Sequence, residues 1–539
     1  MSSFQNEATY KTYVEQGNEQ EFDRLFDEAV AKTKGGVLGK KHGMYIGGKE
    51  VFSGEELVEK SPIDGSHIGT FQKGTREHVK QAVEAARAAF AVWGGMDYRE
   101  RVKIMLNAAG LFRKHKFGIA AILSIENGKT RYESVGEVDE AIDFLNYYSM
   151  EMTRNKGYIR KTRLGGSSTK VDAGFQGAPG SEERISIPLR PYGVFGVIAP
   201  FNFPISISVG MSSGALITGN AVVFKPSSTD NMTMLTGLKV YELLKEAGLP
   251  DGVFNYVTGP GSEVGDELVV NPGVDGIVFT GSRATGLGMI KKALELGQQK
   301  TFVVEMGGKN PAIVGKKADI GDAVDGIASA AFGFDGQKCS ACSRVYVHEL
   351  IKEEFVSKLI DKMRSFKIGD PLKKEVYMGP LISQKAMETY ARSMEEAKAS
   401  GKVLYGGNTV NTGLSGEYVE PALVEVAHSN RLMHDELFVP ILSLDTFKKF
   451  EEAMQKANDV DFGLTAGLYS KNRKEINEFV HGIQAGVAYV NRRTSATTGA
   501  IVGMHTFVGW KGSGLTGKGT GSRYYLQQFM REQSVAVVK

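Results

Sequence analysis

Cysteine is scarce in this sequence, and long apolar runs and a dominant charge are absent. Only Cys339 and Cys342 occur among 539 residues, so disulfides do not hold the chain together, and a reducing compartment, by default the cytoplasm, is predicted. No apolar run reaches the roughly 18 residues of a membrane helix, and the polar, acidic N-terminal residues are unlike a secretion signal. The 65 Lys and Arg residues against 62 Asp and Glu residues leave a net charge of +3, so neither nucleic acid nor a membrane is predicted as a partner.

Glycine, in contrast, is abundant. The chain has 66 glycines, well above an average share of about 7%, without a G-X-Y period or a low-complexity tract. We expect many of them in tight turns at strand ends, where the backbone must approach another group closely.

The order of apolar patterns predicts an α/β fold. Apolar residues recur at helical spacing from 77 to 148. From 194 to 282, and again from 307 to 510, short β-branched runs alternate with helical segments, which is typical of parallel sheets with right-handed crossovers. A hairpin is expected at about 163–190, and the terminal SVAVVK is expected to form a strand that pairs with it or with another subunit.

Cys339, in the segment GQKCSACSR, is a candidate nucleophile. A free thiol has a pKa of about 8.5, and a neighbouring Lys338 or a helix N-terminus would raise its thiolate fraction. The alternatives are a buried structural pair with Cys342, a disulfide switch between the two, a zinc site and a thioredoxin-like dithiol. His348 alone cannot complete a zinc site, so no metal is predicted, and the motif lies too deep in the chain for a thioredoxin-like domain.

Two other residues suit chemistry at the carboxyl ends of strands. Glu305 follows the run TFVV and precedes two glycines, a position typical of a general base facing a ligand crevice, or of an ordinary ion pair at a strand end. Asn202 lies between prolines in PFNFP, where its amide could donate to a developing oxyanion or simply form a turn.

Phosphate- and ribose-binding signals occur in the same region. The segment FTGSRATG at 279–286 ends a predicted strand and opens a helix, so its backbone N–H groups could hold a phosphate. The segment FKPSS at 224–228 ends the second strand of the alternation, where dinucleotide folds meet the adenosine ribose. A plain turn between strand and helix is the alternative for each.

Taken in order, these motifs resemble the aldehyde dehydrogenase superfamily from Met44 to Phe529. Six motifs fall in the family's order and at about its spacing: PFNFP, the Lys225–Pro226 pair, FTGS before Gly286, EMGGK, GQKCSACSR and Glu436-Leu437-Phe438. The resemblance implies an NAD(P)-dependent oxidation of an aldehyde to a carboxylic acid. Cys339 would attack the aldehyde, Asn202 would hold the oxyanion, and Glu305 would activate water. A catalytically silent relative is the alternative, against which the intact trio argues.

The resemblance also implies a domain division and an assembly. An NAD(P)-binding domain would comprise 1–162 and 191–306, and a catalytic domain 307–510. The segments 163–190 and 511–539 would form an oligomerisation element, giving a homodimer or an assembly of dimers.

Cofactor contacts follow by the same resemblance. Lys225 would contact the adenosine ribose, Gly281 and Ser282 the pyrophosphate, and Glu436, with Phe438 beside it, the nicotinamide ribose. Ser228 stands where NAD-preferring members often have an acid, so NAD is expected with NADP possible. The remaining expected cofactor residues are Ala199, Pro200, Phe201, Gly261, Thr280 and Met306.

The finer resemblance is to the L-glutamate γ-semialdehyde (1-pyrroline-5-carboxylate) dehydrogenases of proline breakdown. It implies that Ser340 and the main chain at Gly499 and Ala500 anchor the substrate carboxylate, with Phe507 on its aliphatic part. Val439 and Val508 replace the group's usual glycines, which is expected to reshape the entrance. Another semialdehyde, such as succinate semialdehyde, therefore remains an alternative substrate.

Overall fold

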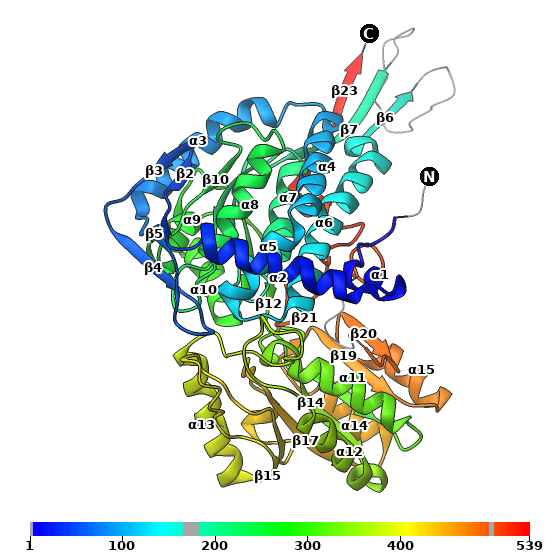
Figure 1. Cartoon of the computed structure of the whole chain (residues 1–539). Coiled ribbons are helices and arrows are strands. Elements are labelled where there is room, and N and C mark those ends of the chain that lie inside the picture. The colour runs from blue at the N-terminus through cyan, green and yellow to red at the C-terminus, as the bar shows by residue number, and fades with distance from the viewer. Residues whose placement is uncertain (1–3, 165–182, 495–500, 539) are drawn as a thin grey trace.

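The predicted α/β class is confirmed by the computed structural model, which describes residues 4–164, 183–494 and 501–538 (Figure 1). Two seven-stranded sheets dominate the molecule, one in its upper and one in its lower part as drawn. None of the helices in the described ranges combines the length and apolar character that crossing a bilayer requires.

The first sheet has the strand order of a dinucleotide-binding fold. Its strands, in spatial order, are β12 (Thr301–Met306), β11 (Gly276–Gly281), β8 (Val194–Ile198), β9 (Ala221–Lys225), β10 (Phe254–Tyr256), β2 (Met44–Ile46) and β3 (Lys49–Val51). The first five are parallel, as the alternating pattern predicted, and β2 and β3 add an antiparallel edge. The chain order reverses between β8 and β11, so a ligand crevice is expected at the carboxyl ends of these two strands.

Helices connect and cover these strands because β8 and β9 are buried along their whole length. The connecting helices are α7 (Ser206–Ile217), α8 (Met234–Glu246), α9 (Asp266–Val270) and α10 (Arg283–Glu295), and α3 (Arg76–Trp93) packs on β8 and β9. The predicted helical run from 77 to 148 continues with α4 (Tyr98–Lys114), α5 (Lys116–Asn127) and α6 (Arg131–Arg154), preceded in the chain by α1 (Thr9–Glu15) and α2 (Glu19–Gly36).

The second sheet repeats the parallel arrangement with one antiparallel edge. Its spatial order is β15 (Lys402–Tyr405), β16 (Ala422–Glu425), β17 (Ile441–Phe447), β14 (Cys342–His348), β13 (Asn310–Val314), β19 (Thr465–Tyr469) and β20 (Val487–Val490). Only β15 runs antiparallel to its neighbour. Its helices are α11 (Ile320–Phe332), α12 (Lys352–Arg364), α13 (Gln384–Ser400), α14 (Phe450–Asn458) and α15 (Arg473–Gly482).

A narrow arm extends from the upper part of the molecule (Figure 1). In it β6 (Ile159–Leu164) pairs antiparallel with β7 (Glu183–Pro191), which also pairs with β22 (Met530–Glu532) and β23 (Val535–Val538). The expected hairpin strands and the terminal strand are thus present and pair with each other, whereas residues 165–182 of the hairpin lie outside the described residues.

Two small sheets complete the described fold. One contains β1 (Lys40–Lys41), β5 (His67–Gln72) and β4 (Glu56–Lys60). The other joins β18 (Phe462–Gly463) to β21 (Trp510–Lys511) and so links the second sheet's region to the C-terminal segment.

Candidate active site

A cavity of about 1020 Å³ opens where the crevice between β8 and β11 was expected. Its walls come from the ends of β8, β11 and β12 on one side and from the loop before β14, the segment 436–438 and the start of α13 on the other. We call it the central cavity. It brings together side chains from both seven-stranded sheets.

Cys339 faces the central cavity from the loop between α11 and β14 and is partly exposed. The pKa of its thiol is raised to about 12, mainly by burial and to a smaller extent by the nearby Glu436 and Glu305 carboxylates. Lys338 does not offset this, because its ammonium is paired with Glu133 at 2.7 Å. The thiol is therefore protonated at neutral pH, and its activation requires a base.

Asn202 lies beside Cys339 because the proline-flanked turn after β8 points its side chain at the cysteine loop. Its Nδ2 donates to the Gln337 carbonyl oxygen at 3.1 Å, and the side chain is buried. One N–H of the amide thus orients the Asn202 side chain, and the second is available to donate to an oxyanion in the cavity.

Glu305 occupies the next-to-last position of β12 and lines the same cavity. Its Oε2 has no hydrogen-bond partner among the described residues. Burial raises the pKa of this carboxyl well above its usual range, and a hydrogen bond from the Gly509 backbone offsets this only in part. Such a carboxyl accepts a proton readily, as a general base must.

The backbone around Glu305 is held by the C-terminal segment. Met306 N–H donates to the Ser513 carbonyl oxygen at 2.8 Å, and Ser513 Oγ donates to the Gly307 carbonyl oxygen at 2.7 Å. Ser513 Oγ also accepts the Gly463 N–H at 3.1 Å. One serine therefore joins the end of β12 to β18.

The two glycines after Met306 allow close approach, as expected. A Cβ at Gly307 would collide with the Glu436 carboxylate, and one at Gly308 would collide with the Cys339 carbonyl oxygen. Gly308 N–H also donates to Glu436 Oε1 at 2.7 Å. Side chains here would displace both the nucleophile's loop and Glu436.

The other end of the cavity suits a dinucleotide. Ser282 caps α10 by accepting the Thr285 N–H at 3.3 Å. Gly281, Ser282 and Thr285 all line the cavity, so the positive end of this helix faces it. The buried Lys225 ammonium donates to the Pro226 carbonyl oxygen at 3.0 Å, and burial lowers its pKa to about 8. Glu436 adds a carboxylate to the lining, with a pKa that burial raises to about 7. Donors for phosphate and acceptors for ribose are thus both present.

Most of the sequence-predicted residues line the central cavity. From the catalytic trio and the cofactor set these are Asn202, Glu305, Cys339, Ala199, Pro200, Phe201, Lys225, Gly261, Thr280, Gly281, Ser282, Met306, Glu436 and Phe438, and from the substrate set Phe507. Ser228 is fully buried instead, its hydroxyl donating to the Pro226 carbonyl oxygen at 3.0 Å. Ser340 is also buried away from the lining, and Gly499 and Ala500 lie outside the described residues.

Several lining residues carry no motif that could have identified them. They are Thr229 and Asn231 after β9, Met289 on α10, and Ser383, Lys385 and Thr389 at the start of α13. Ser227 and Thr285 also line the cavity; they lie within FKPSS and FTGSRATG but were not singled out there. The two valines expected to reshape the entrance, Val439 and Val508, do not line the cavity.

The two cysteines are both free thiols. Cys342 begins β14, is buried, and directs its Sγ toward the Arg344 carbonyl oxygen at 3.6 Å. Cys342 therefore belongs to the core of the second sheet, whereas Cys339 faces the cavity.

Comparison with known proteins identifies this arrangement. Residues 52–535 match the model of the aldehyde dehydrogenase family. The chain belongs to the aldehyde dehydrogenase family. The resemblance recognised in the sequence is confirmed, and with it the enzyme class, an NAD(P)-dependent aldehyde dehydrogenase.

Individual relatives agree with this assignment along nearly the whole chain. A 1-pyrroline-5-carboxylate dehydrogenase of Staphylococcus saprophyticus is 35% identical, with 95% of each chain aligned. The solved structure of 1-pyrroline-5-carboxylate dehydrogenase from Thermus with bound NAD superposes with a TM-score of 0.89 at 33% identity, covering 100% of this chain and 99% of that one. A more distant structure, an NADP-dependent enzyme of Escherichia coli, gives a TM-score of 0.83 at 28% identity over 92% of this chain and 98% of its own.

Proposed function

We propose that this aldehyde dehydrogenase oxidises L-glutamate γ-semialdehyde to L-glutamate with NAD. The observation that carries the proposal is the convergence of Cys339, Glu305 and Asn202 on one cavity whose far end offers phosphate and ribose partners. The 1-pyrroline-5-carboxylate dehydrogenases aligned over 95% of the chain support the choice of substrate.

The residues of the cavity divide the reaction between them. Cys339 loses its proton to a base and its sulfur attacks the aldehyde carbon, forming a thiohemiacetal whose oxyanion the free Asn202 N–H and the Cys339 backbone N–H stabilise. A bound NAD would supply the acceptor for the hydride that leaves this carbon. Glu305 then takes a proton from water, which attacks the resulting thioester, and the acid leaves as the Cys339 thiol is restored.

The cofactor end is assigned to α10 and its neighbours. Gly281 and Ser282 at the start of α10 would hold the pyrophosphate, Lys225 the adenosine ribose, and Glu436, beside Phe438, the nicotinamide ribose. Ala199, Pro200, Phe201, Gly261, Thr280 and Met306 complete the proposed contacts. No acid at Ser228 opposes a 2′-phosphate, so NADP is retained as an alternative cofactor.

Substrate selection is assigned to the opposite end of the cavity. Phe507, which lines it, would pack on the aliphatic part of the semialdehyde. Ser340 and the main chain of Gly499 and Ala500 would anchor the carboxylate. Succinate semialdehyde, which also carries a carboxylate, is the alternative.

The proposal includes the assembly and its surroundings. The proposed division assigns cofactor binding to 1–162 and 191–306, catalysis to 307–510, and oligomerisation to 163–190 and 511–539. The arm of β6, β7 and β23 would extend a sheet between the subunits of a dimer-based assembly. We place the reaction in the cytoplasm, because a nucleophilic thiol needs a reducing compartment.

Initial rates test the substrate and the cofactor together. Glutamate γ-semialdehyde, succinate semialdehyde and propanal are each oxidised with NAD and with NADP, and reduced cofactor is followed by absorbance. We expect the highest kcat/KM for glutamate γ-semialdehyde with NAD. A preference for succinate semialdehyde would keep the mechanism and overturn the substrate, and no turnover of any aldehyde would overturn the proposed function.

A further inference from the structure

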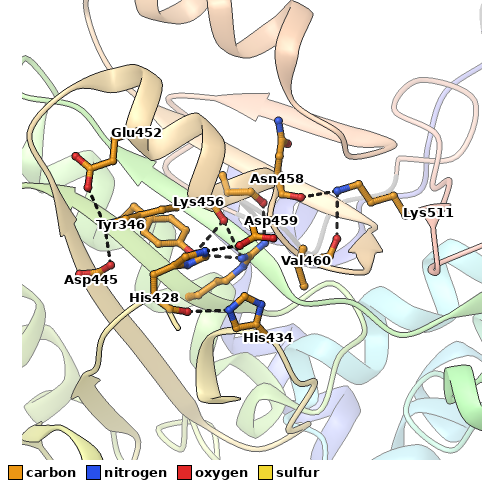
Figure 2. Close-up of polar contacts among 12 residues, drawn as sticks. Tyr346, His428, His434, Asp445, Glu452, Lys456, Asn458, Asp459, Val460 and Lys511 are labelled. Atoms are coloured by element: carbon orange, nitrogen blue, oxygen red, sulfur yellow. Dashed lines mark hydrogen bonds and ion pairs between the residues drawn. The ribbon is translucent and has the colours of Figure 1, made fainter. Parts of the chain in front are cut away.

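Two histidines and an aspartate gather on the second sheet's side of the molecule, apart from the residues that line the central cavity (Figure 2). His428 and His434 flank the short helix η5 (Arg431–Met433), and Asp459 follows α14. One ligand atom from each lies within 4.8 Å of the others. The sequence predicted no metal, because only the two cysteines and His348 were weighed as ligands. His428 and His434 are six residues apart, and Asp459 lies 25 residues beyond His434.

The tautomer of His434 is fixed by the backbone. Its Nε2 lies 2.8 Å from the His428 carbonyl oxygen, which can only accept, so Nε2 carries the proton. Nδ1 therefore keeps a lone pair. A hydrogen bond from one ring nitrogen to a carbonyl is the usual second contact of a metal-binding histidine, because it orients the ring and raises its basicity.

His428 is oriented by Tyr346 in a similar way. Its Nδ1 lies 3.0 Å from the Tyr346 hydroxyl, which also accepts from Arg344 Nη1 at 3.2 Å and lies 3.3 Å from the Lys456 carbonyl oxygen. When the hydroxyl donates to Lys456, Nδ1–H donates to the hydroxyl, and Nε2 presents its lone pair to Asp459 Oδ2 at 3.0 Å. In this tautomer two acceptors face each other, an arrangement that a cation between them stabilises. In the other tautomer Nε2–H donates to Asp459, and a metal ion would take the place of that proton.

The neighbouring positive charges are engaged elsewhere. Lys456 pairs with Asp445 and Glu452 at 2.9 Å each, and Lys511 donates to the carbonyl oxygens of Asn458 and Val460. Arg344, fully buried, donates to backbone carbonyl oxygens and to Tyr346.

Asp459 thus has the His428 ring, at 3.0 Å, as its polar side-chain partner among the described residues, and 72% of the Asp459 side chain is exposed. Arg344 still opposes a second cation, because its field reaches both Asp459 and His428. An exchangeable ion is therefore expected rather than a permanently held one.

We propose that His428, His434 and Asp459 bind a divalent transition-metal ion such as Zn²⁺. Two imidazoles and one carboxylate, with water in the remaining position, form a ligand set that suits this ion. Bound there, the ion would tie the end of α14 to the segment that carries Glu436, which is two residues beyond His434. The site stands independently of the proposed function.

Zinc binding is tested by calorimetry on the full-length, tag-free protein carrying Cys339→Ala, which removes the cavity thiol as a competing ligand. We expect one saturable Zn²⁺ site. Adding His434→Gln or Asp459→Asn should weaken it by about 100-fold or more, since loss of an outer partner alone costs about 10–100-fold. His481→Gln and Asp461→Asn, at a histidine and an acid outside the cluster, serve as matched controls and should bind Zn²⁺ as the Cys339→Ala protein does.

Two results would each overturn the proposal. One is that the Cys339→Ala protein shows no saturable Zn²⁺ binding, and the other is that adding His434→Gln or Asp459→Asn leaves its Zn²⁺ affinity unchanged. Circular dichroism checks the fold of each variant. If His434→Gln fails to fold, Asp459→Asn decides, because its exposed carboxylate is removed without disturbing the core. Thermal unfolding with and without Zn²⁺ gives a second readout, with a rise in Tm expected only where the three ligands are intact.

Discussion

At the residue scale, the environment of Cys339 determines how the thiol must be activated. Its pKa of about 12 is a consequence of burial with two carboxylates nearby, and the adjacent Lys338 is paired with Glu133. From the sequence, Lys338 was expected to raise the thiolate fraction of the candidate nucleophile Cys339, but the lysine is paired elsewhere. Lys338 points to Glu133, which lies 205 positions away in the chain, and no local sequence pattern reveals such a contact.

Replacing Glu305 with Gln tests the base directly. We expect kcat to fall by about 10²–10⁴-fold, because a positioned base contributes that much. Hydride transfer should be slowed less than deacylation, so stopped-flow mixing should show a burst of NADH before a slow steady state. Cys339→Ala should abolish turnover and burst while leaving NADH binding intact. Glu349→Gln, at an exposed carboxylate outside the lining of the central cavity, is the control. A Glu305→Gln enzyme with normal turnover would exclude this base.

The same variant has a pH signature. A general base acts as the carboxylate, and burial raises the pKa of Glu305, so deacylation in the parent enzyme should accelerate as pH rises through that raised pKa. Glu305→Gln should lose this ascending limb. An unchanged pH profile of single-turnover thioester hydrolysis would assign the limb to another group.

A second pair of carboxyls links stability to pH. Glu59 and Glu126 are buried at the N-terminus of α8, where they accept the backbone N–H groups of Met234 and Leu235 at 3.0 and 2.7 Å. Burial raises the pKa of Glu59 to about 7, and burial with the Glu59 charge raises that of Glu126 well above its usual range. The pair therefore keeps a proton that the unfolded chain releases above about pH 4.3.

Because the native state holds more protons in this window, the free energy of unfolding should fall as pH rises from about 4.3 toward 7. One such group contributes a slope of at most about 1.4 kcal/mol per pH unit. Glu126→Gln should flatten the dependence relative to the parent enzyme, and Glu246→Gln, exposed on the same helix, should not. Urea unfolding at several pH values measures both, and equal slopes for all three proteins would contradict the linkage.

At the element scale, the start of α10 combines a structural cap with a proposed phosphate site. Ser282→Ala should lower the free energy of unfolding by about 1 kcal/mol, as loss of an N-cap does, and should also raise the KM for NAD. Asn472 caps α15 in the same way, accepting the Lys474 N–H at 3.0 Å, but outside the lining of the central cavity. Asn472→Ala should therefore reproduce the stability loss without the KM change. If the two variants behave alike in KM, the start of α10 does not hold the cofactor.

Strands and helices were predictable where burial imposes a continuous pattern. The runs that became β8, β9, β13 and β14 are largely buried and contain β-branched residues. β16, a strand of only four residues within PALVEV, was not predicted. The antiparallel edge of β2 and β3 was also not predicted, since it depends on a pairing between Tyr45 and Tyr256 that local sequence cannot reveal.

At the scale of the whole molecule, the proposed assembly depends on the arm. Within the described residues β23 has β7 as its strand partner, and Val537 is 48% exposed on it. Val537→Lys should weaken the proposed sheet between subunits, and light scattering after size exclusion should report a smaller mass. Val480→Lys, at a similarly exposed valine on α15, is the matched control. An unchanged mass for Val537→Lys would remove the arm from the interface.

The Ser513 hydrogen bonds also impose an order of events on synthesis. The strand that carries Glu305 is translated more than 200 residues before the serine that secures its end. A nascent chain can complete the five parallel strands of the first sheet while it is still attached to the ribosome, before Ser513 hydrogen-bonds to Met306 and Gly307 at the end of β12. The hydrogen bonds that hold the end of β12 can therefore form only after Ser513 has emerged, and a chain released before that point would carry the first sheet without them.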